Sequence, residues 1–219
     1  DAIISQSAGP VPIGHGGWLQ GKTDDVDGEI DSVSLGQLPF MSPDQAGNGM
    51  MVAEIGWVIP TGLTTRGYFF GFTDVVHEGT GDGALAITTG TTLVAGNSSA
   101  DGAGFVYSSE ATDADGFYMG AVKATVVGTA VLTSAGSLET VAVDNYLKLR
   151  VEVDTDGDVY FYGAEDLGTA NRRIEPVFQG SQAAAITATT LQFPMFSART
   201  TTTTGVEWEV DYLFGAIAG

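Results

Sequence analysis

The sequence predicts an all-β protein: an antiparallel β-sandwich with an irregular N-terminal arm. Three observations lead to this prediction. Val, Thr, Tyr and Phe, which favour a pleated and half-buried surface, are frequent, and 31 glycines separate the segments in which they concentrate. Several segments alternate between apolar and polar residues with the period of a strand. No amphipathic segment with the period of a helix runs for more than about two turns.

The clearest alternation spans residues 147–153, where aliphatic residues alternate with charged ones. This pattern predicts a strand with one buried and one solvated face. An Asp156-Gly157 step then leads into Val159–Tyr162, which predicts a hairpin because glycine accepts the positive φ of the turn. The C-terminal strand is predicted to have a buried and an exposed side: Val206, Trp208, Val210, Tyr212 and Phe214 face inward, and Glu207, Glu209 and Asp211 face outward.

Further strands are predicted between clusters of Gly, Asp, Asn and Pro, a pattern typical of sandwiches and jelly rolls rather than of βαβ units. These strands are Met51–Ile59, Gly67–Thr73, Leu85–Thr88, Gly104–Tyr107, Phe117–Thr125, Gly136–Val141 and Leu191–Ser197. An Ala triplet in Ser181–Thr187 predicts a short helical turn. Residues 1–48 are predicted to form the irregular arm, which ends in a short strand near Ile30–Leu35 and packs on a neighbour. Residues 49–219 are predicted to form the sandwich domain.

The charge balance excludes two classes of partner. The chain carries 27 acidic and 8 basic side chains, a formal net charge of −19, whereas nucleic acids and anionic membrane surfaces are bound through clusters of Lys and Arg. With 43% hydrophobic and 16% charged residues, the chain is predicted to fold around a core.

The absence of cysteine excludes disulfides, thiolate metal sites and Cys nucleophiles. No apolar run approaches the roughly 20 residues of a membrane-spanning helix, and no signal peptide is recognised.

Four segments occur in order along the chain: Met51–Trp57 leading to Tyr68–Asp74, Gly104–Tyr107 leading to Phe117–Lys123, Leu147–Val153 with its Asp-Gly hairpin, and Val206–Tyr212. Together they resemble the concanavalin A-like (laminin G-type) jelly rolls, and especially the structural proteins of tailed bacteriophages. The resemblance covers about residues 50–215. It implies a concanavalin A-like jelly-roll fold and a virion setting.

The resemblance further implies a non-enzymatic capsid decoration protein on the capsid exterior. Its partners would be the major capsid protein and neighbouring copies of itself in a homo-oligomer, with cell-surface glycans as a further partner class and no nucleic acid or membrane. Lectin relatives carry a calcium cluster and a sugar pocket, but neither can be placed on matching residues here. The Asn-Gly return that usually follows the hairpin is replaced by Tyr162–Asp166. No catalytic, cofactor-binding or metal-ligating residue is therefore assigned, and no cofactor is expected.

Two acidic clusters are candidate cation sites. Asp154, Asp156 and Asp158 alternate around Gly157, but a calcium loop counted from Asp154 would place its glycine where Val159 stands. This cluster therefore favours a solvated turn. A second cluster in the arm, for which a calcium ion shared at a subunit contact is the alternative to a solvated surface, consists of Asp24, Asp25, Asp27 and Glu29.

Catalytic patterns are weak in this sequence. Glu207 and Glu209 would lie about 6.6 Å apart along a strand, a separation that suits a general acid and base. Laminarinase-type glycosidases, however, carry an E-x-D-x-x-E arrangement, which Glu207-Trp-Glu-Val-Asp211 does not match. These carboxylates are predicted to be solvated, or to pair with Lys148 and Arg150 on a neighbouring strand. The two histidines, His15 and His77, stand in no recognised catalytic or metal-binding motif.

A set of aromatic residues could form a platform on which sugars stack, although rings at alternating strand positions are more often part of a core. This set is Trp57, Trp208, Tyr160, Tyr162, Phe69 and Phe72. Three functions are therefore ranked from the sequence. The first is a phage capsid decoration protein, the second a carbohydrate-binding module on a phage tail fibre or a secreted protein, and the third a jelly-roll glycoside hydrolase.

Overall fold

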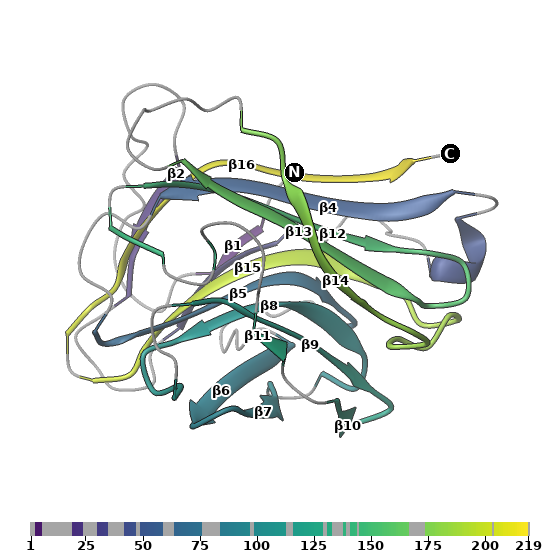
Figure 1. The fold of residues 1–219 in the computed structure, drawn as a ribbon, viewed down its shortest axis with the longest axis horizontal. Coiled ribbons are helices and arrows are strands. Elements are labelled where there is room, and N and C mark those ends of the chain that lie inside the picture. Colours follow the sequence, from purple (N-terminus) through teal and green to yellow (C-terminus); the bar gives the residue numbers. More distant parts are fainter. Residues whose placement is uncertain are drawn as a thin grey trace.

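Two antiparallel sheets stack face to face in the computed structural model (Figure 1). The structure describes residues 3–5, 19–23, 30–34, 42–46, 49–58, 64–75, 84–96, 99–112, 116–128, 131–132, 138, 141–143, 145–166, 174–202 and 204–218. The predicted fold class, an all-β antiparallel sandwich, is confirmed. Among the described residues, no helix has the length and apolar character needed to cross a membrane.

The first sheet has eight strands. In spatial order they are β1 (Ile3–Ser5), β3 (Ile30–Ser34), β15 (Phe193–Thr200), β5 (Arg66–Thr73), β8 (Gly102–Ser108), β9 (Tyr118–Lys123) and β10 (Val126–Val127), with β11 (Val131–Leu132) also paired to β9. The second sheet has six strands. They are β14 (Val177–Gln182), β13 (Val159–Asp166), β12 (Tyr146–Val153), β4 (Met50–Val58), β16 (Glu207–Ala218) and β2 (Leu19–Lys22). A separate hairpin consists of β6 (Leu85–Thr89) and β7 (Thr92–Ala95), and a short 3₁₀ helix, η1, spans Pro43–Gln45.

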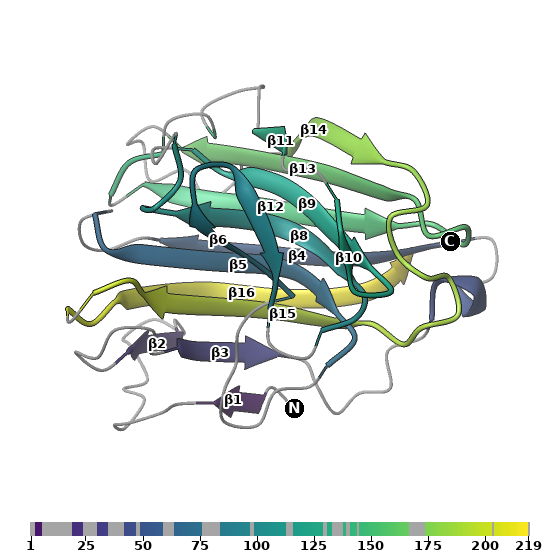
Figure 2. The same ribbon diagram turned by 90° about the horizontal axis from the view of Figure 1, so that it is seen from below.

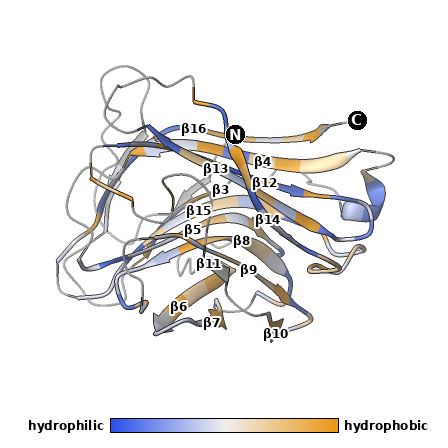
Figure 3. Ribbon diagram, in the orientation of Figure 1, coloured by the Kyte–Doolittle hydropathy of each residue, from blue (hydrophilic) through white to orange (hydrophobic). Residues whose placement is uncertain are grey.

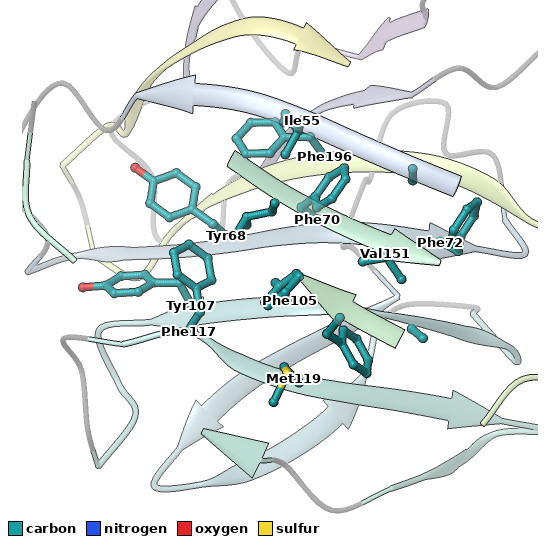
Figure 4. Packing of buried hydrophobic residues seen from close by; sticks show 14 of the residues in the cluster. Ile55, Tyr68, Phe70, Phe72, Phe105, Tyr107, Phe117, Met119, Val151 and Phe196 are labelled. Atoms are coloured by element: carbon teal, nitrogen blue, oxygen red, sulfur yellow. The ribbon is translucent and has the colours of Figure 1, made fainter. Parts of the chain in front are cut away.

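The alternation at residues 147–153 gives β12 its two faces, as predicted. Its aliphatic side chains are fully buried between the sheets, while the charged side chains between them face outward. Figure 3 shows hydrophilic and hydrophobic residues alternating along β12 and β13. The core between the sheets is rich in aromatic rings, and Figure 4 shows Phe70 and Phe105 of the eight-stranded sheet directed toward Ile55 and Val151 of the six-stranded sheet.

Strand β5 does not alternate because both of its faces are buried. Tyr68, Phe70 and Phe72 belong to the core between the sheets, whereas Phe69 points to the other side. There the β6–β7 hairpin covers the eight-stranded sheet, as Figure 2 shows, and a second apolar cluster forms. Its larger members are Phe69, Leu85, Ile87, Leu93, Val106, Tyr118, Val122 and Met195.

The predicted inward orientation of Tyr212 and Phe214 is wrong. The pairing of β16 with β4 shifts between Val210 and Tyr212, so that Asp211 is an extra, bulged residue. Because a slip of one residue turns every following side chain to the opposite face, Leu213 packs against the core instead and Phe214 is 50% exposed. Before the bulge, Trp208 and Val210 are buried as predicted.

Two other local predictions differ from the structure. The helical turn predicted at Ser181–Thr187 is wrong, because Ser181 and Gln182 end β14 and a tight turn follows. The strand predicted at Gly136–Val141 lies mostly outside the described residues. Leu138 and Val141 are described, and both are buried outside any strand.

The described parts of residues 1–48 contain three short strands. The strand predicted near Ile30–Leu35 is confirmed as β3, which pairs with β1 on one side and β15 on the other. β2 pairs instead with β16 in the six-stranded sheet. Apart from these strands, only Thr23 and residues 42–46 of the predicted arm are described, and the division of the chain at residue 48 stays a prediction.

Candidate functional site

A groove lies at one end of the sandwich, between the turn that joins β9 to β10 and the loop that follows β14. Figure 2 shows β10 beside the chain that leaves β14. The groove encloses about 800 Å³, including space that is open to solvent. Most of its lining side chains are small: Ala121, Lys123, Ala124, Val126, Val127, Gly128, Gln182, Ala183, Ala184 and Ala185. Val126 is 71% exposed at its rim.

The backbone that lines this groove is strained. Among the described residues, three residues other than glycine have a positive φ: Ala124 at 48°, Thr125 at 69° and Ala184 at 47°. All three lie in the two loops that line the groove or directly beside it. A left-handed conformation costs an L-residue about 1–2 kcal/mol, and it persists only where the surrounding structure holds it in place.

Asp101 holds both loops. It lies immediately before β8 and is only 4% exposed. Its Oδ2 accepts a hydrogen bond from the backbone N–H of Ala124 at 3.3 Å, and its Oδ1 accepts one from that of Thr187 at 2.6 Å. Lys123 adds a direct link, because its Nζ donates to the backbone oxygen of Ala184 at 3.0 Å. One buried carboxylate therefore connects the two sides of the groove.

The loop that contains Asp101 is itself held in place by hydrogen bonds to a neighbouring carboxylate. The Asp74 carboxylate, just after β5, accepts hydrogen bonds from Ser99 Oγ at 2.8 Å and from the backbone N–H of Ala100 at 3.1 Å. The backbone oxygen of Ala100 in turn accepts the N–H of Thr125 at 2.8 Å. The strained turn after β9 is therefore held by two consecutive residues of the same loop.

The hairpin predicted from the Asp-Gly step is confirmed, and its turn supports the far side of the groove. Asp154 Oδ1 accepts the N–H groups of Asp156 and Asp158, and Gly157 adopts a φ of +83°. Asp158 Oδ1 accepts the N–H of Ala184 at 2.5 Å. The backbone oxygen of Gly157 accepts the N–H groups of the next two residues, 185 and 186. A Cβ at Gly157 would collide with the backbone there, so the close approach requires glycine.

The solvated-turn interpretation holds for exposed Asp156, while Asp158 binds the loop after β14. In the parts of the chain that the structure describes, no group of three or more His, Cys, Asp or Glu side chains is arranged to hold a metal ion. The arm cluster of Asp24, Asp25, Asp27 and Glu29 lies outside the described residues, as do His15 and His77.

A second polar constellation covers the outer face of the six-stranded sheet. Glu54 of β4 stands at its centre with 13% of its side chain exposed. It accepts hydrogen bonds from Tyr212 Oη at 2.5 Å and from Arg150 Nε at 2.7 Å, and Lys148 Nζ lies 3.9 Å away. A Cβ at Gly56 would collide with the ring of Tyr212, so this glycine lets the tyrosine lie over β4.

The predicted partners of Lys148 and Arg150 are thus wrong. β4 lies between β12 and β16, so both cations meet Glu54 rather than the carboxylates of β16. Burial by itself would lower the pKa of Arg150, but the hydrogen bond and charge of Glu54, together with nearby Glu152, raise it above its ordinary value. Arg150 Nη1 also lies 3.6 Å from Glu152 Oε1.

Of the predicted aromatic platform, only Tyr160 and Tyr162 lie on the surface. The other four members are buried: Trp57, Trp208, Phe69 and Phe72. The ring of Tyr162 contacts the ring of Phe178 on β14, and the two ring centroids are 5.6 Å apart. Phe178 is 50% exposed. Phe178 lies in a segment without clear alternation, so only the pairing of β14 with β13 reveals it.

The carboxylates of β16 do not form a catalytic cleft with either region. Glu207 is exposed and Glu209 is half-buried, and they pair in register with Lys22 and Gln20 of β2. Asp211 accepts a hydrogen bond from Tyr146 Oη at 3.0 Å. Neither glutamate lines the groove after β9.

Solved structures similar to this chain include lectin-like domains and an alginate lyase. A legume lectin-like domain from Entamoeba histolytica is 13% identical, with a TM-score of 0.61 over all of this chain and 90% of that one. The carbohydrate recognition domain of Emp46p, in a potassium-bound form, is 13% identical, with a TM-score of 0.57 over 97% of this chain and 86% of that one. The family 7 alginate lyase A1-II′ is 8% identical, with a TM-score of 0.54 over 95% of this chain and 81% of that one.

At these identities the likeness shows the fold, a lectin-like jelly-roll sandwich, and confirms that part of the resemblance found in the sequence. No protein-family model matches the sequence, and no curated protein matches it at a significant level. The capsid decoration part of the resemblance stays a prediction.

Proposed function

We propose that the protein binds carbohydrate without transforming it, and that the ligand occupies the groove between the β9–β10 turn and the loop after β14. The observation that carries this proposal is the backbone strain at Ala124, Thr125 and Ala184. The buried carboxylate of Asp101 and the backbone oxygen of the residue before it accept the N–H groups of the first two, and the Asp158 carboxylate accepts that of the third. Strained backbone held in place by the surrounding fold is concentrated at ligand sites. Loops that are already ordered also lower the entropic cost of binding.

The lining suits a sugar in its chemistry. A sugar ring offers an apolar C–H face and a rim of hydroxyl groups, and ligand sites combine apolar contact with a few placed polar groups. Here Val126 and Val127 supply apolar surface, while Lys123 and Gln182 supply polar groups. Two of the similar structures are a lectin-like domain and a carbohydrate recognition domain, which supports the same function at the level of the fold.

A hydrolase is the weaker hypothesis for this groove. Glycoside hydrolysis generally uses two carboxyl groups that flank the scissile bond. Among the described residues, the groove lining contains none. Asp101 and Asp158 lie behind it, with oxygens engaged by backbone N–H groups. The similar alginate lyase shows that the fold also carries enzymes, and fold alone does not decide between the two.

The proposal is tested on a glycan array, with and without calcium, followed by titration calorimetry on the best ligand. Ala183→Trp should fill the exposed groove and weaken binding at least tenfold. Ala142→Trp, an equally exposed alanine outside the groove, should leave affinity unchanged. Absence of binding to any glycan, or equal affinity of the Ala183→Trp variant and the wild type, would overturn the proposal.

Asp101→Asn tests how the groove is held. An amide can accept hydrogen bonds at only one of its two terminal atoms, so either Ala124 or Thr187 loses its acceptor. We expect faster hydrogen exchange at one of these two amides and a loss of about 1–3 kcal/mol in the free energy of unfolding. Asp156→Asn, at an exposed turn position, is the control and should change neither. Unchanged exchange at both amides would contradict the role given to Asp101.

The decoration function implied by the four-segment resemblance remains a separate prediction, together with the capsid exterior location and the partnership with a major capsid protein. Its test is co-sedimentation of the purified protein with capsids that lack it. Failure to co-sediment would remove this prediction and leave carbohydrate binding untouched.

A further inference from the structure

The outer face of the six-stranded sheet is open in the part of the chain that the structure describes. Figure 1 shows β4, β12 and β16 as the upper layer of the sandwich, with no described strand stacked above them, whereas the β6–β7 hairpin underlies the other sheet. The outward side chains at its centre are partly exposed, from 13% for Lys148 to 35% for Arg150, and Phe178 at its margin is 50% exposed.

The centre of this face consists of paired charges, and the Asp211 carboxylate lies beside it, where it accepts a hydrogen bond from Tyr146 Oη. Two carboxylates, Glu54 and Glu152, lie among two cations, Lys148 and Arg150. Separations of 2.6 to 3.9 Å show that each charge has its counter-charge within the face itself. A charged partner would have to displace these internal pairs, whereas an uncharged partner would not.

Aromatic rings flank these charge pairs. Tyr160 and Tyr162 are two residues apart on β13, so they share one face of the strand about 6.6–6.8 Å apart. Phe178 stands beside Tyr162, and Tyr212 lies on the far side of the centre with Lys148 Nζ 5.9 Å from its ring centroid. Several of these side chains are fixed by hydrogen bonds, as Tyr160 Oη to Asp154 and Tyr212 Oη to Glu54 show, which lowers the entropy lost on binding.

We infer that this face is a second binding surface, separate from the groove, for an uncharged polysaccharide chain that lies across the Tyr160, Tyr162 and Phe178 rings beside the Arg150–Glu54 pair. Ring faces stack on the C–H faces of sugars, and the paired charged groups can hydrogen-bond hydroxyls without losing their mutual contacts. A protein partner fits less well, because the cores of protein interfaces are depleted in charged residues and four charges would have to be desolvated at the centre of this one.

The shape of the face calls for a polymer rather than a single sugar. The rings stand on a sheet surface at successive positions, so one sugar unit contacts one or two of them, and several linked units contact all. Affinity should therefore increase with chain length and should be insensitive to salt, since no net charge is neutralised on binding.

The experiment is a retention assay with the full chain on insoluble cellulose, chitin and mannan, with polygalacturonate gel as the anionic comparison. Retention on at least one neutral polymer, unchanged when the salt is raised severalfold, is the expected result. Tyr162→Ala and Phe178→Ala should each lower retention at least fivefold, and Tyr162→Phe, which keeps the ring, should retain the polymer as the wild type does. Leu191→Ala, an exposed apolar residue outside the face, is the control.

Ala183→Trp separates this inference from the proposed function, because filling the groove should leave polymer retention intact. Loss of retention in that variant would place the polymer in the groove and overturn the second surface. No retention on any neutral polymer, salt-sensitive retention on polygalacturonate alone, or self-association of the chain that Tyr162→Ala abolishes would overturn it as well. Circular dichroism of each variant confirms that a loss reflects the face and not unfolding.

Discussion

The two sheets of this sandwich present opposite kinds of outer face. The eight-stranded sheet turns Phe69 and Val106 outward and covers them with the β6–β7 hairpin, which forms a second apolar cluster. The six-stranded sheet turns Lys148, Arg150 and Glu152 outward, where they pair with carboxylates or cations of the same face and stay partly exposed. The difference was already present in the strand patterns, since a strand buried on both faces loses its alternation and a strand with one open face keeps it.

Removing an aromatic ring tests the comparison with the largest expected effect. Phe69→Ala leaves a cavity beneath the hairpin and should lower the free energy of unfolding by about 3–5 kcal/mol, as large-to-small changes in a core do. Tyr162→Ala on the open face should cost less than about 1 kcal/mol. Urea unfolding of both variants measures the difference, and equal losses would show that the two faces are not distinct in burial.

A charge substitution sharpens the comparison within the open face. Glu54→Gln removes the carboxylate that accepts hydrogen bonds from Arg150 and Tyr212. We expect the free energy of unfolding to fall by about 1–3 kcal/mol, because both donors are left with a weaker acceptor. Glu207→Gln, at an exposed position of β16, should change stability by less than about 0.5 kcal/mol. If the two variants unfold at the same urea concentration, the network around Glu54 contributes nothing measurable.

Tyrosine titration gives the most selective contrast. Burial raises the pKa of Tyr68, inside the sandwich, to about 12, whereas the charge of Asp154 is the main cause of the raised pKa of Tyr160 on the outer side of β13. Because the folded state of Tyr68 keeps its proton above the ordinary pKa of 10, its contribution to stability is complete below pH 10 and is lost between about pH 10 and 12. That loss amounts to about 2–3 kcal/mol at the upper limit.

Ultraviolet difference titration with and without added salt separates the two tyrosines. Salt screens the Asp154 carboxylate at the surface turn, so the pKa of Tyr160 should fall toward its ordinary value, while that of Tyr68 should hardly move. Tyr68→Phe and Tyr160→Phe assign each transition. A salt-dependent pKa for Tyr68 would contradict its placement in the core.

Much of the sandwich could be predicted from local patterns. Residues 147–153, the Asp-Gly hairpin and the first half of β16 carried period-two alternation or turn chemistry, and the structure confirms them. Prediction failed where the local pattern of a strand does not specify its register against the partner strand. Asp211 gives no local sign that it is the extra residue of a bulge, so Tyr212 and Phe214 were assigned to the wrong face.

The candidate sites were less accessible to sequence analysis for the same reason. The sequence does not identify Asp101 as a site residue, because an isolated aspartate before a strand resembles any turn residue. Only the structure shows that its two carboxylate oxygens accept hydrogen bonds from Ala124 and Thr187. The one available signal was its position in Ala100-Asp101-Gly102, at the start of a strand that lacks alternation. Tyr160 and Tyr162 were identified, but their neighbour Phe178 was not.

The sequence by itself determined the fold class, the sides of the alternating strands and the acidic character of the surface, because these follow from residue type and spacing along one segment. Only the tertiary structure decided which strands are neighbours, and so which charges meet. It joined Glu54 to Arg150 across 96 positions and Asp101 to Thr187 across 86. The groove and the open face both depend on such long-range pairs, which no local pattern specifies.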